Sequence, residues 1–236
     1  MAALRDYVTH KPESIVEISC DQSSHTQVKA LCDSKKVSCR VKVVTDLPSR
    51  LEAKINLEML SEAEFLDDIS GGGPPIILAL DHVQDPRNFG AIVRTAAFYG
   101  YPYVLVPKVR QSLLTNASVA TAQGGFAFCK AVYLTNLGRT LLKLKDAGYW
   151  IFGAAADGEP LKSPKHYVEK SVLVMGGEEK GMSAGVVKKC DFKISAGPEN
   201  SLVDSLNVSV ATGILVNEFF LLHQKHSEKN ADGAFA

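Results

Sequence analysis

Cysteine is scarce in this chain of 236 residues, and its few cysteines form no pair with the spacing of a metal or redox motif. Cys20, Cys32, Cys39, Cys129 and Cys190 are odd in number, and no two of them are separated by only two residues. Neither a disulfide framework nor a structural zinc site is therefore favoured. We expect reduced thiols and a cytoplasmic protein.

The sequence patterns of several common enzyme classes are also missing. The stretch VMGGEEKGMS lacks the Gly-Lys-Ser/Thr ending of a phosphate-binding loop, and no Gly-x-Gly-x-x-Gly opens the first strand-to-helix turn of the second half. This excludes the ordinary dinucleotide and class I methyltransferase fingerprints. The six histidines are scattered without ligand spacing, so no metal is expected. His82 is the only histidine near the motifs described below, and we expect a structural or peripheral role for it.

Long apolar runs and net charge are absent as well. The N-terminal stretch MAALRDYVTHKPE has no apolar signal core, and the most apolar helical pattern, near 208–222, is interrupted by Asn217 and Glu218. We therefore expect a soluble protein that does not span a membrane. The 26 basic and 26 acidic residues cancel, which argues against binding nucleic acid through bulk charge. Residues 29–54 nevertheless hold seven basic and three acidic side chains, which fits either a solvated surface or a patch that binds nucleic acid.

Glycine and proline cluster at one place, SGGGPP at 70–75, which predicts a boundary between two domains. We expect a domain of small α/β type at 1–70, a linker at 71–75 and a larger domain at 76–236. In the larger domain, apolar strand-like runs alternate with helical patterns at 76–80, 103–106, 130–133, 149–154, 171–175 and 192–194. This alternation predicts an α/β fold with a mostly parallel sheet, helices on both faces and a ligand site at the carboxyl ends of the strands.

Three segments repeat one pattern, an apolar strand followed by small and polar residues. They are DPRNFGAIVRTA at 85–96, VMGGEEKGMS at 174–183 and DSLNVSVATG at 204–213. We expect the three turns to share one site. The candidate catalytic residues in them are Asn88, Arg94, Glu178, Ser205 and Asn207.

Each candidate also has a structural interpretation. Asn88, Ser205 and Asn207 precede or open helices and could cap them. Arg94 could extend to the surface or pair with a carboxylate such as Asp81 or Asp85, because burying a guanidinium without a partner is costly. Its functional interpretation is a fixed fork of donors aimed at a phosphate. Glu178 lies between glycines that either form a turn or let the backbone approach a ligand.

At these segments the chain resembles the SpoU (TrmH-type) RNA ribose 2′-O-methyltransferases of the SPOUT superfamily. The resemblance rests on LDHVQDPRNFGAIVRTA, VLVMGGEEKGMS and SLNVSVATGILVNE, in the order and separation of the family's three motifs, and covers roughly residues 76–222. The segments VPKVR and LTNASVATAQGG are most similar to the subgroup that methylates a guanosine ribose in large-subunit ribosomal RNA. The first part resembles the ribosomal-protein-like substrate-binding module of many members.

The resemblance implies methyl transfer from S-adenosylmethionine to a ribose 2′-hydroxyl of RNA, in a fold with a deep C-terminal trefoil knot. It also implies a homodimer packed through the knot, in which the arginine reaches toward the cofactor held by the partner. Arg94 would engage the phosphate beside the target nucleotide and assist deprotonation, with Asn88, Glu178 and Asn207 orienting it and the ribose. The implied cofactor-binding residues are Gly176, Gly177, Ile194, Ala196 and Leu206.

One segment departs from the family pattern. The family usually has an Ile-Pro-Met-like run before the third motif, whereas this chain reads ISAGPENSLVDSLN, one residue longer, with Ala196, Gly197 and Pro198 in the adenine region. Lost apolar contact would weaken cofactor binding, unless backbone hydrogen bonds compensate. The expected function is methylation of ribosomal RNA. A transfer-RNA methyltransferase and a catalytically silent RNA-binding relative are the alternatives.

Overall fold

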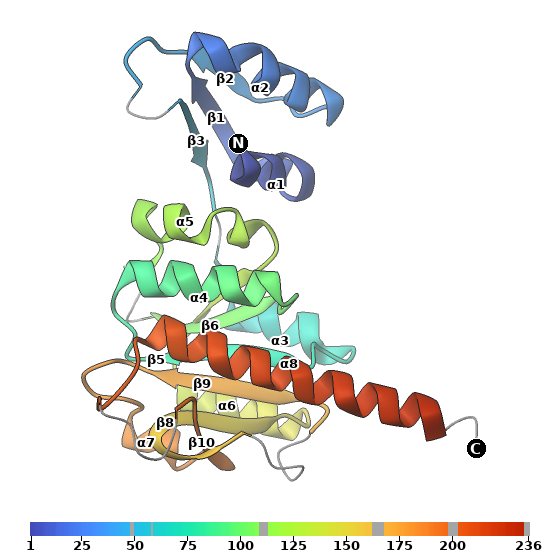
Figure 1. Ribbon diagram of the computed structural model, residues 1–236, viewed down its shortest axis with the longest axis vertical. Coiled ribbons are helices and arrows are strands. Elements are labelled where there is room, and N and C mark those ends of the chain that lie inside the picture. The colour runs from blue at the N-terminus through green and yellow to red at the C-terminus, as the bar shows by residue number, and fades with distance from the viewer. Residues whose placement is uncertain (48–49, 58, 109–112, 162–167, 198–202, 234–236) are drawn as a thin grey trace.

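The computed structural model describes residues 1–236 except 48–49, 58, 109–112, 162–167, 198–202 and 234–236, and contains two β-sheets (Figure 1). The smaller sheet, at the N-terminal end, has the order β2-β1-β3, with β2 parallel and β3 antiparallel to β1. Its elements are α1 (Ala2–His10), the 3-10 turn η1 (Pro12–Ser14), β1 (Ile15–Cys20), α2 (Gln22–Ser34), β2 (Arg40–Val43) and β3 (Leu51–Ile55).

Burial alternates along β1 because successive side chains of a strand point to opposite faces. Ile18 and Cys20 are fully buried and share a core with Val28 of α2 and Tyr7 of α1. The other face carries Glu17, whose neighbours across the two adjacent strands are Arg40 and Lys54. One face of the small sheet is therefore apolar and covered by helices, whereas the other is charged.

The larger sheet has seven strands in the order β10-β8-β9-β5-β6-β7-β4, and every pairing in it is parallel. All six residues of its central strand, IILALD, are buried, which is typical of a parallel sheet covered on both faces. The strands are β4 (Leu60–Ser61), β5 (Ile76–Asp81), β6 (Tyr103–Pro107), β7 (Lys130–Leu134), β8 (Trp150–Pro160), β9 (Ser171–Gly176) and β10 (Phe192–Ser195).

Helices cover both faces of this sheet, as the alternation of strands and helices predicts. Leu78 of β5 belongs to the apolar cluster that includes residues of α4 and α8, whereas Ile77 belongs to the cluster that includes residues of α3, α6 and α7. Figure 1 shows α4 and α8 side by side on one face. The helices are α3 (Glu62–Ser70), α4 (Pro86–Phe98), α5 (Asn116–Ala122), α6 (Leu137–Asp146), α7 (Ala184–Val187) and α8 (Val208–Gly233), with the 3-10 turn η3 (Gly125–Ala127).

The division into sheets does not fall at the Gly-Pro cluster. Strand β4 pairs with β7, and Phe65 and Ile69 of α3 pack into the core of the larger sheet, although both elements precede the linker expected at 71–75. The division lies instead between β3 and β4. Helix α3 begins with a capping box, in which the Ser61 hydroxyl and the Glu64 carboxylate each accept from the other's backbone N–H. Through Phe65 and Ile69 the helix belongs to the larger unit.

The five cysteines are free thiols, and the Sγ atoms of Cys32 and Cys39 lie 3.9 Å apart. Burial raises the pKa of the Cys32 thiol to about 11, so this thiol stays protonated near neutral pH. Among the described residues, no group of three or more potential ligands could hold a metal ion. In the same part of the chain, none of the helices has the length and apolar character needed to cross a membrane.

Candidate active site

The site is built where β5 and β9 end side by side. Asp81, the last residue of β5, pairs in register with Gly176, the last residue of β9. A Cβ added at Gly176 would lie 2.4 Å from the carbonyl carbon of Gly181, and one added at Gly177 would lie 2.3 Å from the backbone oxygen of His82. Any side chain at these two positions would collide with backbone atoms. Gly176 therefore lets the turn after β9 fold closely onto itself, and Gly177 lets this turn pack against the turn after β5.

Three polar side chains from the three predicted motifs meet at this edge. Asn88 Nδ2 donates to Glu178 Oε1 at 2.8 Å, and Asn207 Nδ2 donates to the same oxygen at 2.9 Å. Asn207 Nδ2 also lies 3.1 Å from Asn88 Oδ1. We call Asn88, Glu178 and Asn207 the amide-carboxylate cluster. Residues up to 119 positions apart in the sequence thus surround one carboxylate, as the motif pattern predicted.

Local helix chemistry fixes the orientation of both amides. Asp85 caps α4 by accepting from the Arg87 backbone N–H at 2.8 Å, which leaves the Asn88 side chain available for Glu178. The capping role considered for Asn88 is therefore wrong. Asn207 does cap α8, because its Oδ1 accepts from the Ser209 backbone N–H at 2.9 Å. With its oxygen engaged by the helix, its amide nitrogen must face Glu178.

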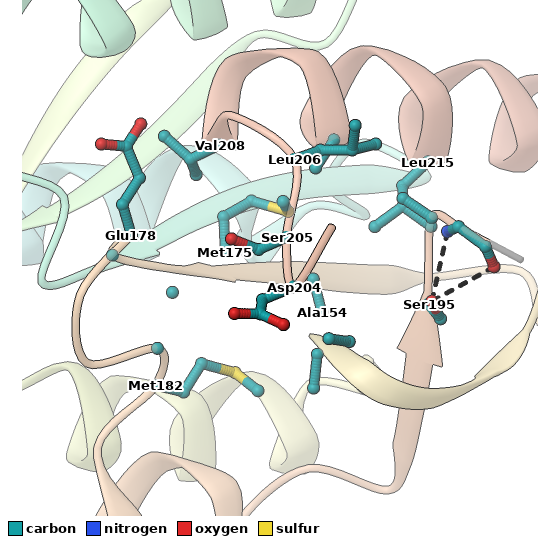
Figure 2. Close-up of a pocket in the computed structure, with 18 of the residues that line it drawn as sticks. Ala154, Met175, Glu178, Met182, Ser195, Asp204, Ser205, Leu206, Val208 and Leu215 are labelled. Carbon is teal, nitrogen blue, oxygen red and sulfur yellow. Dashed lines mark hydrogen bonds between the residues drawn. The ribbon is translucent and has the colours of Figure 1, made fainter. Parts of the chain in front are cut away.

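Beside the cluster lies a cavity of about 550 Å³ between β8, β9, the segment before α8 and the first turns of α8. Figure 2 shows Glu178 at one end, Ser195 at the other, and Met175, Ser205 and Asp204 between them. Its lining is mostly aliphatic, with a few charged groups. The lining residues include Ala154, Ala155, Ala156, Met175, Met182, Lys193, Asp204, Val208 and Leu215.

Most of the residues expected to hold a cofactor line this cavity. Gly176, Gly177, Ala196 and Leu206 do so, and Ser205 lines it as well. Ile194 is the exception among the five, because it is fully buried and not part of the lining.

The sequence analysis missed the alanines at 154–156 and the two methionines of the wall, Met175 and Met182. The signal for the alanines was available, since a run of small residues after the apolar strand WIF leaves space for a ligand.

Arg94 does not join the cluster within one chain. It follows Asn88 by six residues on α4, which places it about 120° around the helix and about 9 Å along it. The Arg94 backbone packs against Gly125, and its side chain is exposed. Among the described residues it has no ion pair with Asp81, Asp85 or another carboxylate. Of the two structural interpretations of Arg94, exposure at the surface is the one observed.

His82 has an unusual backbone conformation directly beside the cluster. Its φ is 63°, in the left-handed region that costs a residue with a Cβ about 1–2 kcal/mol. Its Nδ1 lies 3.1 Å from Asp81 Oδ1, and Asp81 Oδ2 accepts from the Ser183 backbone N–H at 2.7 Å. The ring also borders a second cavity of about 150 Å³, which shares Glu178 and Val208 with the larger one.

The lengthened segment before the third motif is partly described. Ala196 and Gly197 line the large cavity, and the Gly197 backbone N–H donates to Ser195 Oγ at 3.2 Å. Pro198 lies outside the described residues. Ala196, with its single methyl group, and Gly197, which has no side chain, therefore border the space in which the resemblance expects the adenine.

Comparison with known proteins agrees with this geometry. Residues 75–217 match the SpoU rRNA methylase family, a span that contains all three motifs. This chain belongs to the SpoU rRNA methylase family. The family predicted from the sequence is thereby confirmed.

Two relatives extend the match beyond the motifs. The 23S rRNA (guanosine-2'-O-)-methyltransferase RlmB of Pseudomonas syringae pv. tomato is 37% identical over 189 residues, which cover 79% of this chain and 71% of the relative. RlmB of Nitrosomonas europaea is 30% identical over 243 residues, which cover 98% of this chain and 92% of the relative. The second match therefore includes the small N-terminal sheet.

A solved structure also shares the fold. The SpoU methyltransferase AviRb of Streptomyces viridochromogenes, solved in complex with AdoMet, superposes with a TM-score of 0.74 over 96% of this chain and 89% of its own. Its sequence identity is 18%, so this likeness speaks for the fold alone. The predicted α/β fold with a mostly parallel sheet is confirmed.

Proposed function

We propose that this SpoU-family protein transfers a methyl group from S-adenosylmethionine to a ribose 2′-hydroxyl of large-subunit ribosomal RNA, at a guanosine. The amide-carboxylate cluster carries the proposal, because three motifs distant in sequence place one oriented carboxylate beside a cavity of cofactor size. The names of the RlmB relatives support the choice of RNA.

The large cavity fits the proposed cofactor in size and in charge. Its volume of about 550 Å³ lies within the usual range of small-molecule sites, roughly 300–1,000 Å³. Aliphatic side chains would contact the adenosyl group, and Glu178 and Asp204 offer negative charge for the sulfonium and amino groups. Lys193, which also lines the cavity, offers positive charge for the carboxylate.

When bound, S-adenosylmethionine supplies a methyl group on a good leaving group, so the remaining task is alignment and proton removal. The two amides hold Glu178 in place, and this preorganisation allows the carboxylate to orient the ribose without rearranging. Arg94 binds the phosphate beside the target nucleotide, and its positive charge favours the developing 2′-oxyanion while the hydroxyl proton passes to water. Ser205 lies on the cavity wall and contributes a hydroxyl to the same surface.

The test is methylation, in parallel, of ribosomal RNA and transfer RNA isolated from cells that lack this protein. We expect the purified protein and S-adenosylmethionine to restore one 2′-O-methyl mark on a guanosine of the large-subunit RNA, mapped by its resistance to alkaline cleavage. A mark on transfer RNA instead would select the alternative substrate. Cofactor binding without any mark would identify an RNA-binding relative and reject the enzymatic proposal.

We further propose a homodimer in which Arg94 serves the partner's site, joined through a C-terminal trefoil knot as the family resemblance implies. Arg94 and Phe98 are four residues apart and share a face of α4, and Phe98 is 82% exposed. An apolar ring so exposed favours a protein contact on this face. Val210 and Leu221 of α8, the helix beside α4, are exposed apolar residues as well.

The N-terminal module is proposed to bind RNA through the charged face of its sheet. Arg40 and Lys54 flank Glu17 there, and Lys42 donates to the Glu17 carboxylate at 2.6 Å, which lowers the pKa of that carboxyl. Replacing Arg40, Lys42 and Lys54 with alanine is expected to weaken RNA binding and to reduce its salt slope by up to about 2–3, because fewer counterions are released. Filter binding at several salt concentrations measures this slope.

The control removes three charges from the opposite side of the molecule, at Arg139, Lys188 and Lys189 of α6 and the end of α7. This control variant should keep the slope of the wild type. If both triple variants change the slope equally, or neither changes it, the charged face of the small sheet has no specific role in RNA binding.

Cofactor affinity provides a separate prediction. The lack of a long apolar side chain at 196–197 should make binding weaker than a fully apolar wall would, yet calorimetric titration should detect saturable heat below about 1 mM. Ala196→Ile should tighten binding by about tenfold, as expected for one added aliphatic side chain. Weaker binding by this variant would show that backbone atoms at 196–197 already contact the cofactor and that the isoleucine side chain collides with it.

A further inference from the structure

His82 stands out because a histidine occupies a backbone conformation that favours glycine. Among the described residues, Lys36, His82 and Gln123 are the non-glycine residues with positive φ, and His82 is the one at the carboxyl edge of the large sheet. Strain of this kind persists where the surroundings enforce it, and it is common at functional sites. His82 and two members of the amide-carboxylate cluster, Asn88 and Glu178, line the same small cavity.

Asp81 lies against one edge of the His82 ring, and part of the side chain remains exposed. Nδ1 is buried near Asp81 Oδ1 and has no hydrogen-bond partner among the described residues, so this contact is electrostatic rather than a well-aligned hydrogen bond. Asp81 is itself held by the Ser183 backbone N–H. The side chain is nevertheless 32% exposed. The exposed atoms of the side chain are therefore ones other than Nδ1, and the residue borders the small cavity.

The small cavity has the composition of a site for a neutral, hydrogen-bonding group. Its wall carries the carboxylates of Asp85, Glu178 and Glu179 against the single ammonium of Lys180. This excess of negative charge would repel a phosphate. A nucleobase is neutral and offers amino and imino donors that carboxylates accept, together with ring acceptors for a cationic or N–H group. Glu178 separates this cavity from the larger one, so a nucleotide could place its base here and its sugar beside Glu178.

We propose that the small cavity receives the nucleobase of the target nucleotide and that His82 positions this base by a hydrogen bond from its imidazole ring. This inference rests on the proposed function, since it requires an RNA substrate whose ribose lies at Glu178. Asp81 lies against the Nδ1 edge of the ring, and His82, with its left-handed backbone, lines the cavity. In this proposal His82 is a substrate-binding residue, whereas the sequence alone predicted a structural or peripheral role.

The test compares His82→Gly and His82→Asn in steady-state methylation at saturating S-adenosylmethionine and varied RNA. His82→Gly should raise the KM for RNA about 10-fold, the effect of one hydrogen bond, with kcat within about threefold. Its thermal midpoint should stay the same or rise, because glycine adopts φ near 63° without steric cost. His82→Asn should recover most of the KM, since asparagine tolerates this backbone and keeps a hydrogen-bonding side chain.

The matched control is Gln123→Gly, which removes a side chain at the positive-φ residue that ends α5. It should leave the KM for RNA unchanged. The inference is overturned if His82→Gly keeps the KM of the wild type within twofold, or if the Gly and Asn variants are equally impaired with lowered midpoints. These results require an active wild type. A wild type that methylates no RNA would reject the proposed function itself.

Discussion

Arg94→Ala is expected to lower the rate of methyl transfer by at least about 100-fold, equivalent to about 2.7 kcal/mol of activation free energy. The Arg94 guanidinium can clamp a phosphate with two parallel hydrogen bonds, and no other residue supplies that contact in the proposed mechanism. Cofactor binding should stay within about twofold, because the group assigned to Arg94 in the proposed mechanism is the RNA phosphate and not the cofactor. Single-turnover methylation and calorimetric titration measure the two quantities.

Arg139→Ala is the control, since it removes the same charge from α6 on the opposite face of the sheet. A rate for Arg94→Ala within about tenfold of the wild type would reject the assigned role. Mixing Arg94→Ala with Glu178→Ala then tests the arrangement in the dimer. If Arg94 serves the partner's site, mixed dimers hold one intact site and recover about a quarter of the activity. If it acts within its own chain, mixing recovers none.

The second large effect is expected at Gly176. A Cβ there would lie 2.4 Å from the carbonyl carbon of Gly181 and 2.5 Å from the Met182 nitrogen, and backbone atoms cannot move aside as a flexible side chain can. Gly176→Ala should therefore displace the turn that carries Glu178, lower the free energy of unfolding by about 1–3 kcal/mol and weaken S-adenosylmethionine binding by at least about 10-fold. Chemical denaturation and calorimetric titration provide the measurements.

Gly185→Ala is the matched substitution, because a Cβ at Gly185 meets no atom within 4 Å in the short helix α7. Its stability should equal or slightly exceed that of the wild type, since alanine is the better helix former. Equal cofactor affinity in the Gly176 and Gly185 variants would mean that the close approach of the turns does not matter for binding.

The sequence by itself determined the elements and the identity of the three motifs. The apolar run IILAL is recognisable as a buried parallel strand because five consecutive apolar residues need cover on both faces, and the alternation with helices follows from the same requirement. The glycines at 176 and 177 indicated a turn with close backbone approach. These inferences succeed because strand periodicity and turn chemistry are local properties of the chain.

Tertiary structure alone decided which side chains meet. Asn88 and Arg94 lie in one predicted helix, yet only Asn88 reaches Glu178, because six residues of helix rotate Arg94 to another face. The place of β4 and α3 in the large sheet, before the glycine-rich segment, depends on long-range strand pairing that no local pattern specifies. The strained conformation of His82 is likewise imposed by packing against Gly177 and Asp81. Residues with a Cβ disfavour positive φ, so the residue type alone predicts a different backbone conformation. Local sequence patterns thus identify the candidate site residues, and the geometry of the folded chain determines which of them are in contact.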